Sequence, residues 1–156
     1  MLIEKDKRGI ELQLLYSDEN FSVPANVYII GMMNTADRSL AMLDYALRRR
    51  FSFFTMKPGF NTPGFQAYQD SLGSDAFNKL IACVKQLNSK IAEDISLGEG
   101  FCIGHSYFCG LAPETANTQT LSSIVEYELI PLLKEYWFDE PAKIVDWSDR
   151  LRSAVK

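Results

Sequence analysis

Apolar residues fill the stretch from Val27 to Met33 almost without a break. This pattern is typical of a strand buried on both faces of a parallel sheet, although a buried helix segment gives a similar run. Pro24 and Asn26 precede the run and polar residues follow it, so a short strand is favoured. Asn34 then lies at the carboxyl end of the predicted strand, the edge at which open α/β sheets bind ligands.

The residues on either side of this strand predict further elements of the same part of the fold. Leucines at helical spacing indicate a short helix from about Leu40 to Leu47. Phe51–Met56 is again apolar and predicts the last strand of the sheet. Upstream, Ile10–Tyr16 alternates loosely and indicates a strand or one arm of a hairpin, with a turn at residues 17–20.

The pattern changes at the segment Lys57–Gly64, which is rich in proline and glycine and marks a boundary between two parts. After it, apolar positions recur at helical spacing, and Ser74 is a suitable N-cap for the longest of the helices. The expected helices are Pro63–Ser71, Asp75–Ile91, Thr120–Ile130 with Pro131 as a kink or a new start, and a last segment from Pro141. The predicted fold class is an α/β part, residues 1–57, followed by an all-α part, residues 58–156.

The polar cluster that follows the first predicted strand, Asn34–Ser39, has two interpretations. Thr35, Asp37 and Ser39 are each common N-cap residues for the next helix. An amide at Asn34 and a carboxylate at Asp37 would also suit the orientation of a water that attacks a phosphoryl group. The two readings are compatible, because one residue can cap the helix while its neighbour orients the water.

Three arginines, Arg48, Arg49 and Arg50, close the predicted short helix. Cations at a helix C-terminus are favourable, by about 0.3–1 kcal/mol each when exposed. Guanidinium groups also suit charge that develops on a transferred phosphoryl group, in the same subunit or in a neighbouring one. Three arginines in succession exceed what the helix-end explanation accounts for.

The chain lacks the phosphate-binding loop of nucleotide hydrolases. That loop has the pattern Gly-x-x-x-x-Gly-Lys-Ser/Thr, and no Gly-Lys pair occurs in these 156 residues. Asp18 and Glu19 are not expected to be a magnesium-binding acidic pair, because they do not directly end a buried apolar strand. A lone histidine such as His105 is most often structural, and the glycine-rich stretch 98–104 predicts a turn or a helix cap.

Composition narrows the class of protein. The chain is 47% hydrophobic and 23% charged with a net charge of −4, which argues against a broad basic face for nucleic acid. No apolar run reaches membrane-spanning length, and the N-terminus lacks the apolar core of a signal peptide. Three cysteines and one histidine make a structural zinc site improbable. Reduced thiols and a cytoplasmic location are the simplest expectation.

Two stretches, Gly31–Ser39 and Asp44–Phe51, closely resemble the McrB family, the GTP-driven AAA+ motor subunits of methylcytosine-specific restriction systems. The Met-Asn-Thr-Ala-Asp-Arg-Ser motif within them is far more specific than a lone glycine pattern. The resemblance continues through Gly100–Cys109 and Pro131–Asp139, so it covers the chain roughly from Phe21 onward.

The resemblance implies roles for particular residues. Asn34 would be the first sensor, and Asp37 would help to place the attacking water. Arg49 and Arg50 would be the arginine fingers that reach into the site of the adjacent subunit. Three further residues would have secondary roles at the same site: Thr35, Arg38 and Arg48. In the lid, His105 and Ser106 would be candidate nucleotide contacts, although the arginine usual at such a position is missing.

The resemblance also implies the machinery around the chain. Residues 1–57 would be the C-terminal part of a AAA+ nucleotide-binding core, and residues 58–156 would be its helical lid. GTP would be hydrolysed, with ATP the second choice, and Mg²⁺ and the phosphate loop would be held by a missing N-terminal half of the module. Identical subunits in a ring and a McrC-like nuclease would be partners, and DNA would be contacted only through absent domains.

Two alternatives remain open from the sequence. The chain could be a non-catalytic assembly or regulatory module that docks onto a complete motor, which the missing phosphate loop favours. It could also belong to a different AAA+ family that uses ATP, because the residues that contact the base cannot be identified here.

Overall fold

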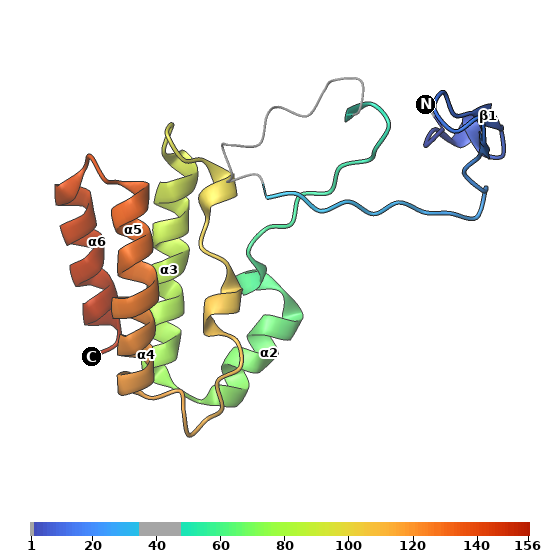
Figure 1. The fold of residues 1–156 in the computed structure, drawn as a ribbon. Helices are drawn as coiled ribbons and strands as arrows, with labels where there is room; N and C mark the ends of the chain where they lie inside the picture. The colour runs from blue at the N-terminus through green and yellow to red at the C-terminus, as the bar shows by residue number, and fades with distance from the viewer. Residues whose placement is uncertain (1, 35–47) are drawn as a thin grey trace. The chain divides into compact units, whose positions relative to one another are not determined.

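The computed structural model describes residues 2–34 and 48–156, which belong to two compact units, Met1–Thr55 and Met56–Lys156 (Figure 1). The predicted helix from about Leu40 to Leu47 lies outside the described residues. The described part is mostly helical, and its sheet has two strands.

The first unit contains a short 3-10 helix, η1 (Lys5–Lys7), and a small antiparallel sheet. Strand β1 (Leu12–Gln13) pairs with β2 (Asn20–Phe21), and Leu12 lies opposite Phe21. The predicted hairpin arm at Ile10–Tyr16 is therefore confirmed, although only two residues on each side are paired.

The two strands predicted at Val27–Met33 and Phe51–Met56 are wrong for this structure. Both stretches are outside regular secondary structure, and their large side chains face solvent, with Ile30 91% and Phe54 88% exposed. A strand needs neighbouring strands to bond its N–H and C=O groups, and within residues 2–34 and 48–55 only the short hairpin forms a ladder. The predicted α/β part is thus not formed by the described residues, and Asn34 is exposed rather than seated at a sheet edge.

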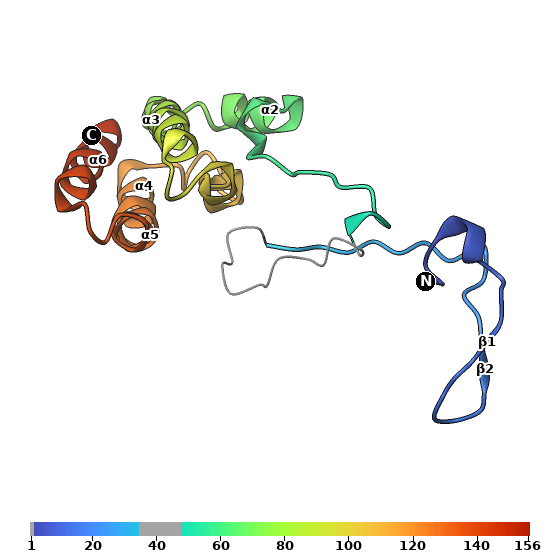
Figure 2. The same cartoon turned by 90° about the horizontal axis from the view of Figure 1, so that it is seen from above.

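The second unit is a helical domain, as predicted for the C-terminal part. Its main helices are α2 (Pro63–Leu72), α3 (Asp75–Glu93), α4 (Thr118–Ile124), α5 (Ile130–Tyr136) and α6 (Pro141–Ala154). Short 3-10 turns join them: η2 (Gly59–Asn61), η3 (Glu99–Phe101) and η4 (His105–Phe108). Helix α6 packs against both α3 and α5, as the two views in Figures 1 and 2 show.

Helix α3 is the central element of this unit. The Ser74 hydroxyl accepts a hydrogen bond from the Phe77 N–H, so the predicted N-cap is confirmed. The predicted apolar stripe is also confirmed, since all six of its members are at most 1% exposed: Phe77, Leu80, Ile81, Val84, Leu87 and Ile91. Each of them contributes about 1.5–3 kcal/mol of transfer free energy, before the entropy of ordering is counted.

A five-residue π-helix, η5 (Val125–Leu129), joins α4 to α5 without a break in the helix. At its end the Ile130 N–H donates to the Val125 carbonyl, five residues back. Pro131 lacks an N–H, and in an α-helix its ring would crowd the carbonyl four residues before it. The wider turn accommodates Pro131, which is why the helix expected to kink or restart here continues to Tyr136.

Candidate functional site

The residues with predicted catalytic roles belong to the first unit, and the structure describes only some of them. Asn34 is exposed at the end of an extended segment. Arg48 is helical, and Arg49 and Arg50 lie in the turn that follows it. Three further predicted residues, Thr35, Asp37 and Arg38, lie outside the described residues. The structure therefore does not test whether the amide, the carboxylate and the arginines converge on one site.

Arg48 and Arg50 each contact another side chain of the first unit. The Arg48 guanidinium lies over the Phe53 ring, 5.5 Å from its centroid, which is a cation–π contact. The Arg50 Nε donates to the Glu4 Oε1, 46 residues earlier in the chain, at 2.5 Å. The side chains of Arg50 and Glu4 are only 22% and 30% exposed. The sequence alone did not identify Glu4 as a partner of Arg50, because two residues that pair across 46 positions show no local sequence pattern.

His105 is enclosed by the start of the second unit. Its Nδ1 accepts a hydrogen bond from the Gly59 N–H at 3.0 Å, and its ring meets those of Phe60 and Phe65 edge-on. A Cβ at position 59 would lie 2.9 Å from the His105 ring, so the glycine permits the close approach. These contacts match the structural role expected of a lone histidine. The neighbouring Ser106 is exposed, and a nucleotide contact by either residue stays a prediction.

Asn88 is a buried polar residue that sequence reasoning did not single out. Its amide NH₂ donates to the Ile103 carbonyl at 2.9 Å, and its oxygen accepts from the Ile103 N–H at 2.7 Å. The side chain thus bonds the segment between η3 and η4 to α3 as a strand partner would. The Leu-Asn step within an apolar stripe was the available signal, because a polar residue beside buried positions needs a partner.

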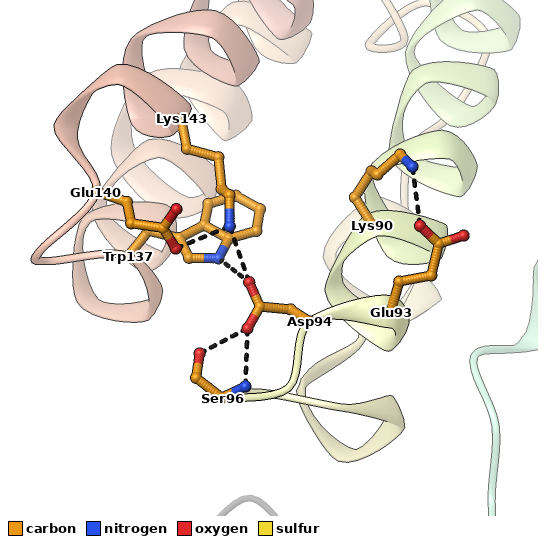
Figure 3. A network of polar contacts seen from close by, with 7 residues as sticks. All are labelled: Lys90, Glu93, Asp94, Ser96, Trp137, Glu140 and Lys143. Carbon is orange, nitrogen blue, oxygen red and sulfur yellow. Dashed lines mark hydrogen bonds and ion pairs between the residues drawn. The ribbon is translucent and has the colours of Figure 1, made fainter.

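Asp94, just after α3, is the centre of a network of polar contacts (Figure 3). One carboxylate oxygen accepts from the Ser96 N–H at 2.9 Å and from the Ser96 hydroxyl at 2.6 Å. The other accepts from the Trp137 indole N–H at 2.8 Å and from the Lys143 ammonium at 2.9 Å. Lys143 also pairs with Glu140 and lies over the Trp137 ring. One carboxylate therefore links the end of α3 to the end of α5 and the start of α6.

These contacts stabilise the charged forms. Hydrogen bonds from Ser96, Lys143 and Trp137 hold the pKa of the Asp94 carboxyl well below its ordinary value. Hydrogen bonds from its ammonium to Glu140 and Asp94 raise the pKa of Lys143. Both groups are charged at neutral pH, and the Asp94 side chain is only 10% exposed.

A groove of about 630 Å³ lies beside this network, between α3 and α6. Its walls carry both charges and two indole rings, and the Arg150 guanidinium covers the Trp147 ring at 4.9 Å. The groove is lined by charged side chains of both signs: Lys90, Glu93, Asp94, Lys143, Asp146 and Arg150. This mixture does not select an anionic or a cationic ligand.

Two absences apply to the part of the chain that the structure describes. Residues 2–34 and 48–156 contain no group of three or more histidine, cysteine or acidic side chains placed to hold a metal ion. In the same residues no helix has both the length and the apolar character needed to cross a membrane.

Comparison with known proteins identifies the helical unit. Residues 79–145 match the family model described as the alpha-helical lid domain of McrB. The chain is 50% identical to the type IV methyl-directed restriction enzyme EcoKMcrB subunit of Escherichia coli K12, over 97% of the chain and 35% of that protein. It is 32% identical to the type II restriction enzyme BsuMI component YdiS of Bacillus subtilis 168, over 54% of the chain and 26% of that protein.

Nearly all of the chain is thus matched, but the chain spans only about a third of the length of the E. coli relative. The match to the lid model lies wholly within the second unit, which has the expected helical structure. The resemblance to the McrB family is confirmed by both comparisons, and the chain belongs to this family, whose α-helical lid domain it contains.

Proposed function

We propose that this chain is part of a GTP-hydrolysing AAA+ motor in a methyl-directed restriction system. In this role the chain supplies sensor and arginine-finger residues, and the nucleotide is held by other polypeptide. The observation that carries the proposal is 50% identity to the E. coli restriction subunit over 97% of the chain. The Met-Asn-Thr-Ala-Asp-Arg-Ser motif of this sequence supports it.

The proposed roles follow the chemistry of the side chains. Asn34 both donates and accepts hydrogen bonds, so it suits a sensor of the terminal phosphate, and Asp37 would orient the attacking water. Arg49 and Arg50 would stabilise the charge that develops on the phosphoryl group in the neighbouring subunit's site. GTP would supply the reacting phosphate, and Mg²⁺ would neutralise part of its charge. A phosphate loop on other polypeptide would hold both.

The exposed apolar segments of the first unit are a reason to propose contact with a second polypeptide. Side chains such as Ile30, Met32 and Phe54 are 88–97% exposed, and a large exposed apolar surface is typical of a site that contacts other polypeptide. We propose that these segments become strands when the remainder of the nucleotide-binding core is present. The assembled unit would form a ring of identical subunits and engage a McrC-like nuclease, while DNA would be contacted through other domains.

Mixing tests the proposal. The chain alone is expected to hydrolyse no GTP, whereas the chain mixed with a polypeptide that carries the phosphate loop and acidic pair is expected to do so. Arg49→Ala and Arg50→Ala should then lower kcat by about a thousandfold, the low end of the range for an arginine finger. Asn34→Ala should also lower it, while Arg150→Ala, an exposed arginine of α6, serves as the matched control.

Restored turnover that survives both Arg49→Ala and Asn34→Ala would exclude the catalytic assignment. If mixing restores no turnover but the chain still binds a complete motor, the non-catalytic docking module is favoured, as the missing phosphate loop suggests. A preference for ATP over GTP in the same assay would instead indicate a motor that uses ATP.

A further inference from the structure

The contact between Glu4 and Arg50 joins the two ends of the first unit. The Glu4 Oε1 accepts from the Arg50 Nε, and both side chains are less than one-third exposed. An ion pair of this exposure has only a small effect on stability. Its larger consequence is geometric, because it restrains the orientation of a long side chain that would otherwise sample many rotamers.

Glu4 itself is held by its surroundings. Its carbonyl accepts from the Lys7 N–H at 3.0 Å, and the Arg8 Nη2 donates to the preceding carbonyl, that of Ile3, at 3.1 Å. The Gly9 N–H donates to the Val23 carbonyl at 2.9 Å, which ties this segment to the residues after the hairpin. Gly9 has a φ of 78°, a conformation that glycine adopts without strain. The carboxylate is thus presented by a folded segment.

The atom that Glu4 contacts also matters. A guanidinium has five N–H donors, and the two nitrogens at its Nη end can bind two oxygens of a phosphoryl group together. A carboxylate bonded at Nε restrains the orientation of the guanidinium. The same carboxylate is a fixed hydrogen-bond partner of the kind that keeps functional groups within about 0.5 Å of their working geometry.

We propose that Glu4 is a positioning residue for Arg50, an inference that rests on the proposed function. Glu4 orients the Arg50 guanidinium toward the phosphoryl group of the neighbouring subunit and touches neither the nucleotide nor the reacting atoms. Its removal therefore slows turnover without weakening the binding of GTP.

The test uses this chain assembled with the polypeptide that carries the phosphate loop. Glu4→Gln should lower kcat for GTP about tenfold and leave KM unchanged, since misplacement of a catalytic group by about 1 Å costs up to a hundredfold. Glu4→Asp, which keeps the charge on a shorter side chain, should recover part of the loss. In an Arg50→Ala background, Glu4→Gln should cause no further loss. Glu11→Gln, an exposed carboxylate in the same segment, is the matched control.

Each other outcome overturns the inference in a distinguishable way. Normal turnover of Glu4→Gln beside a strongly impaired Arg50→Ala overturns the role of Glu4 and leaves the proposed function intact. Normal turnover of Arg50→Ala overturns the assignment of Arg50 and, with it, the role of Glu4. An equal loss from Glu4→Gln with and without Arg50 shows a purely structural effect, and sedimentation with the partner polypeptide verifies that each variant still assembles.

Discussion

Asp94 shows how one side chain links the ends of three helices. Its carboxylate accepts four hydrogen bonds, two from Ser96 and one each from Trp137 and Lys143 (Figure 3). The Ser96 pair shapes the turn after α3, and the other two donors come from the end of α5 and the start of α6. In the sequence this residue is an ordinary acidic residue at a helix end, so its role depends on partners more than 40 residues away.

Asp94→Asn should lower the free energy of unfolding of the helical unit by about 2 kcal/mol at pH 7. The amide removes the negative charge and turns one acceptor oxygen into an NH₂ group that faces existing donors. Urea denaturation followed by circular dichroism measures the change. Asp139→Asn, at an exposed position, should have little effect, and an equal loss in both variants would contradict the assignment.

The same residue predicts an acid dependence. The pKa of Asp94 is lowered on folding, so its contribution is present above the unfolded-state pKa of about 4 and is lost as pH falls toward the folded-state value. The stability difference between the wild-type chain and Asp94→Asn should therefore shrink between about pH 5 and pH 2. Urea denaturation of both proteins across this range measures it, and a constant difference would argue against the charged network.

At the scale of elements, α3 was predictable because its information is local. The apolar residues at helical spacing and the N-cap residue all lie within about twenty consecutive residues. The structure has the helix from Asp75 to Glu93. The η5 segment was not predictable, since a π-turn depends on how Pro131 is accommodated in a helix whose other residues are already packed. The segment between η3 and η4 was also missed, because it has no regular period and is held by the side chain of Asn88.

Asn88→Leu should destabilise the helical unit by about 2–4 kcal/mol. A leucine fits the apolar surroundings but leaves the buried N–H and C=O of Ile103 without the two hydrogen bonds they have now. Urea denaturation gives the change in stability, and faster hydrogen exchange of the Ile103 amide localises it. Asn78→Leu, exposed on the same helix, is the control, and an unchanged Ile103 amide would contradict the prediction.

At the scale of the whole molecule, the two units differ in how completely they bury their apolar side chains. The helical unit has a continuous core that includes Phe77, Phe108, Leu133 and Trp137, each at most 1% exposed. Among residues 2–34 and 48–55 of the first unit no side chain is fully buried, most of the large apolar ones are exposed, and only the hairpin strands pair in a sheet. Burial of apolar surface is the main favourable term in folding, so the helical unit carries the stability.

Residues 56–156 should therefore fold without the first unit. We expect this fragment to show helical circular dichroism and a cooperative thermal transition within a few degrees of that of the full chain. In sedimentation it should be monomeric, whereas the full chain should self-associate through segments 27–33 and 51–56. A fragment without a cooperative transition, or a full chain that stays monomeric at high concentration, would contradict this account.

The sequence by itself determined the family, the helical character of the second unit and the apolar face of α3, because each depends on short motifs or on a local period. The identities of Asn34, Asp37 and the arginines as candidate site residues also came from local motifs, and their convergence stays a prediction. Only the tertiary structure decided that the apolar run at Val27–Met33 is exposed, since a strand exists only where neighbours bond its backbone. It also decided the partners of Asp94, Asn88 and Glu4, which depend on contacts between residues far apart in the chain.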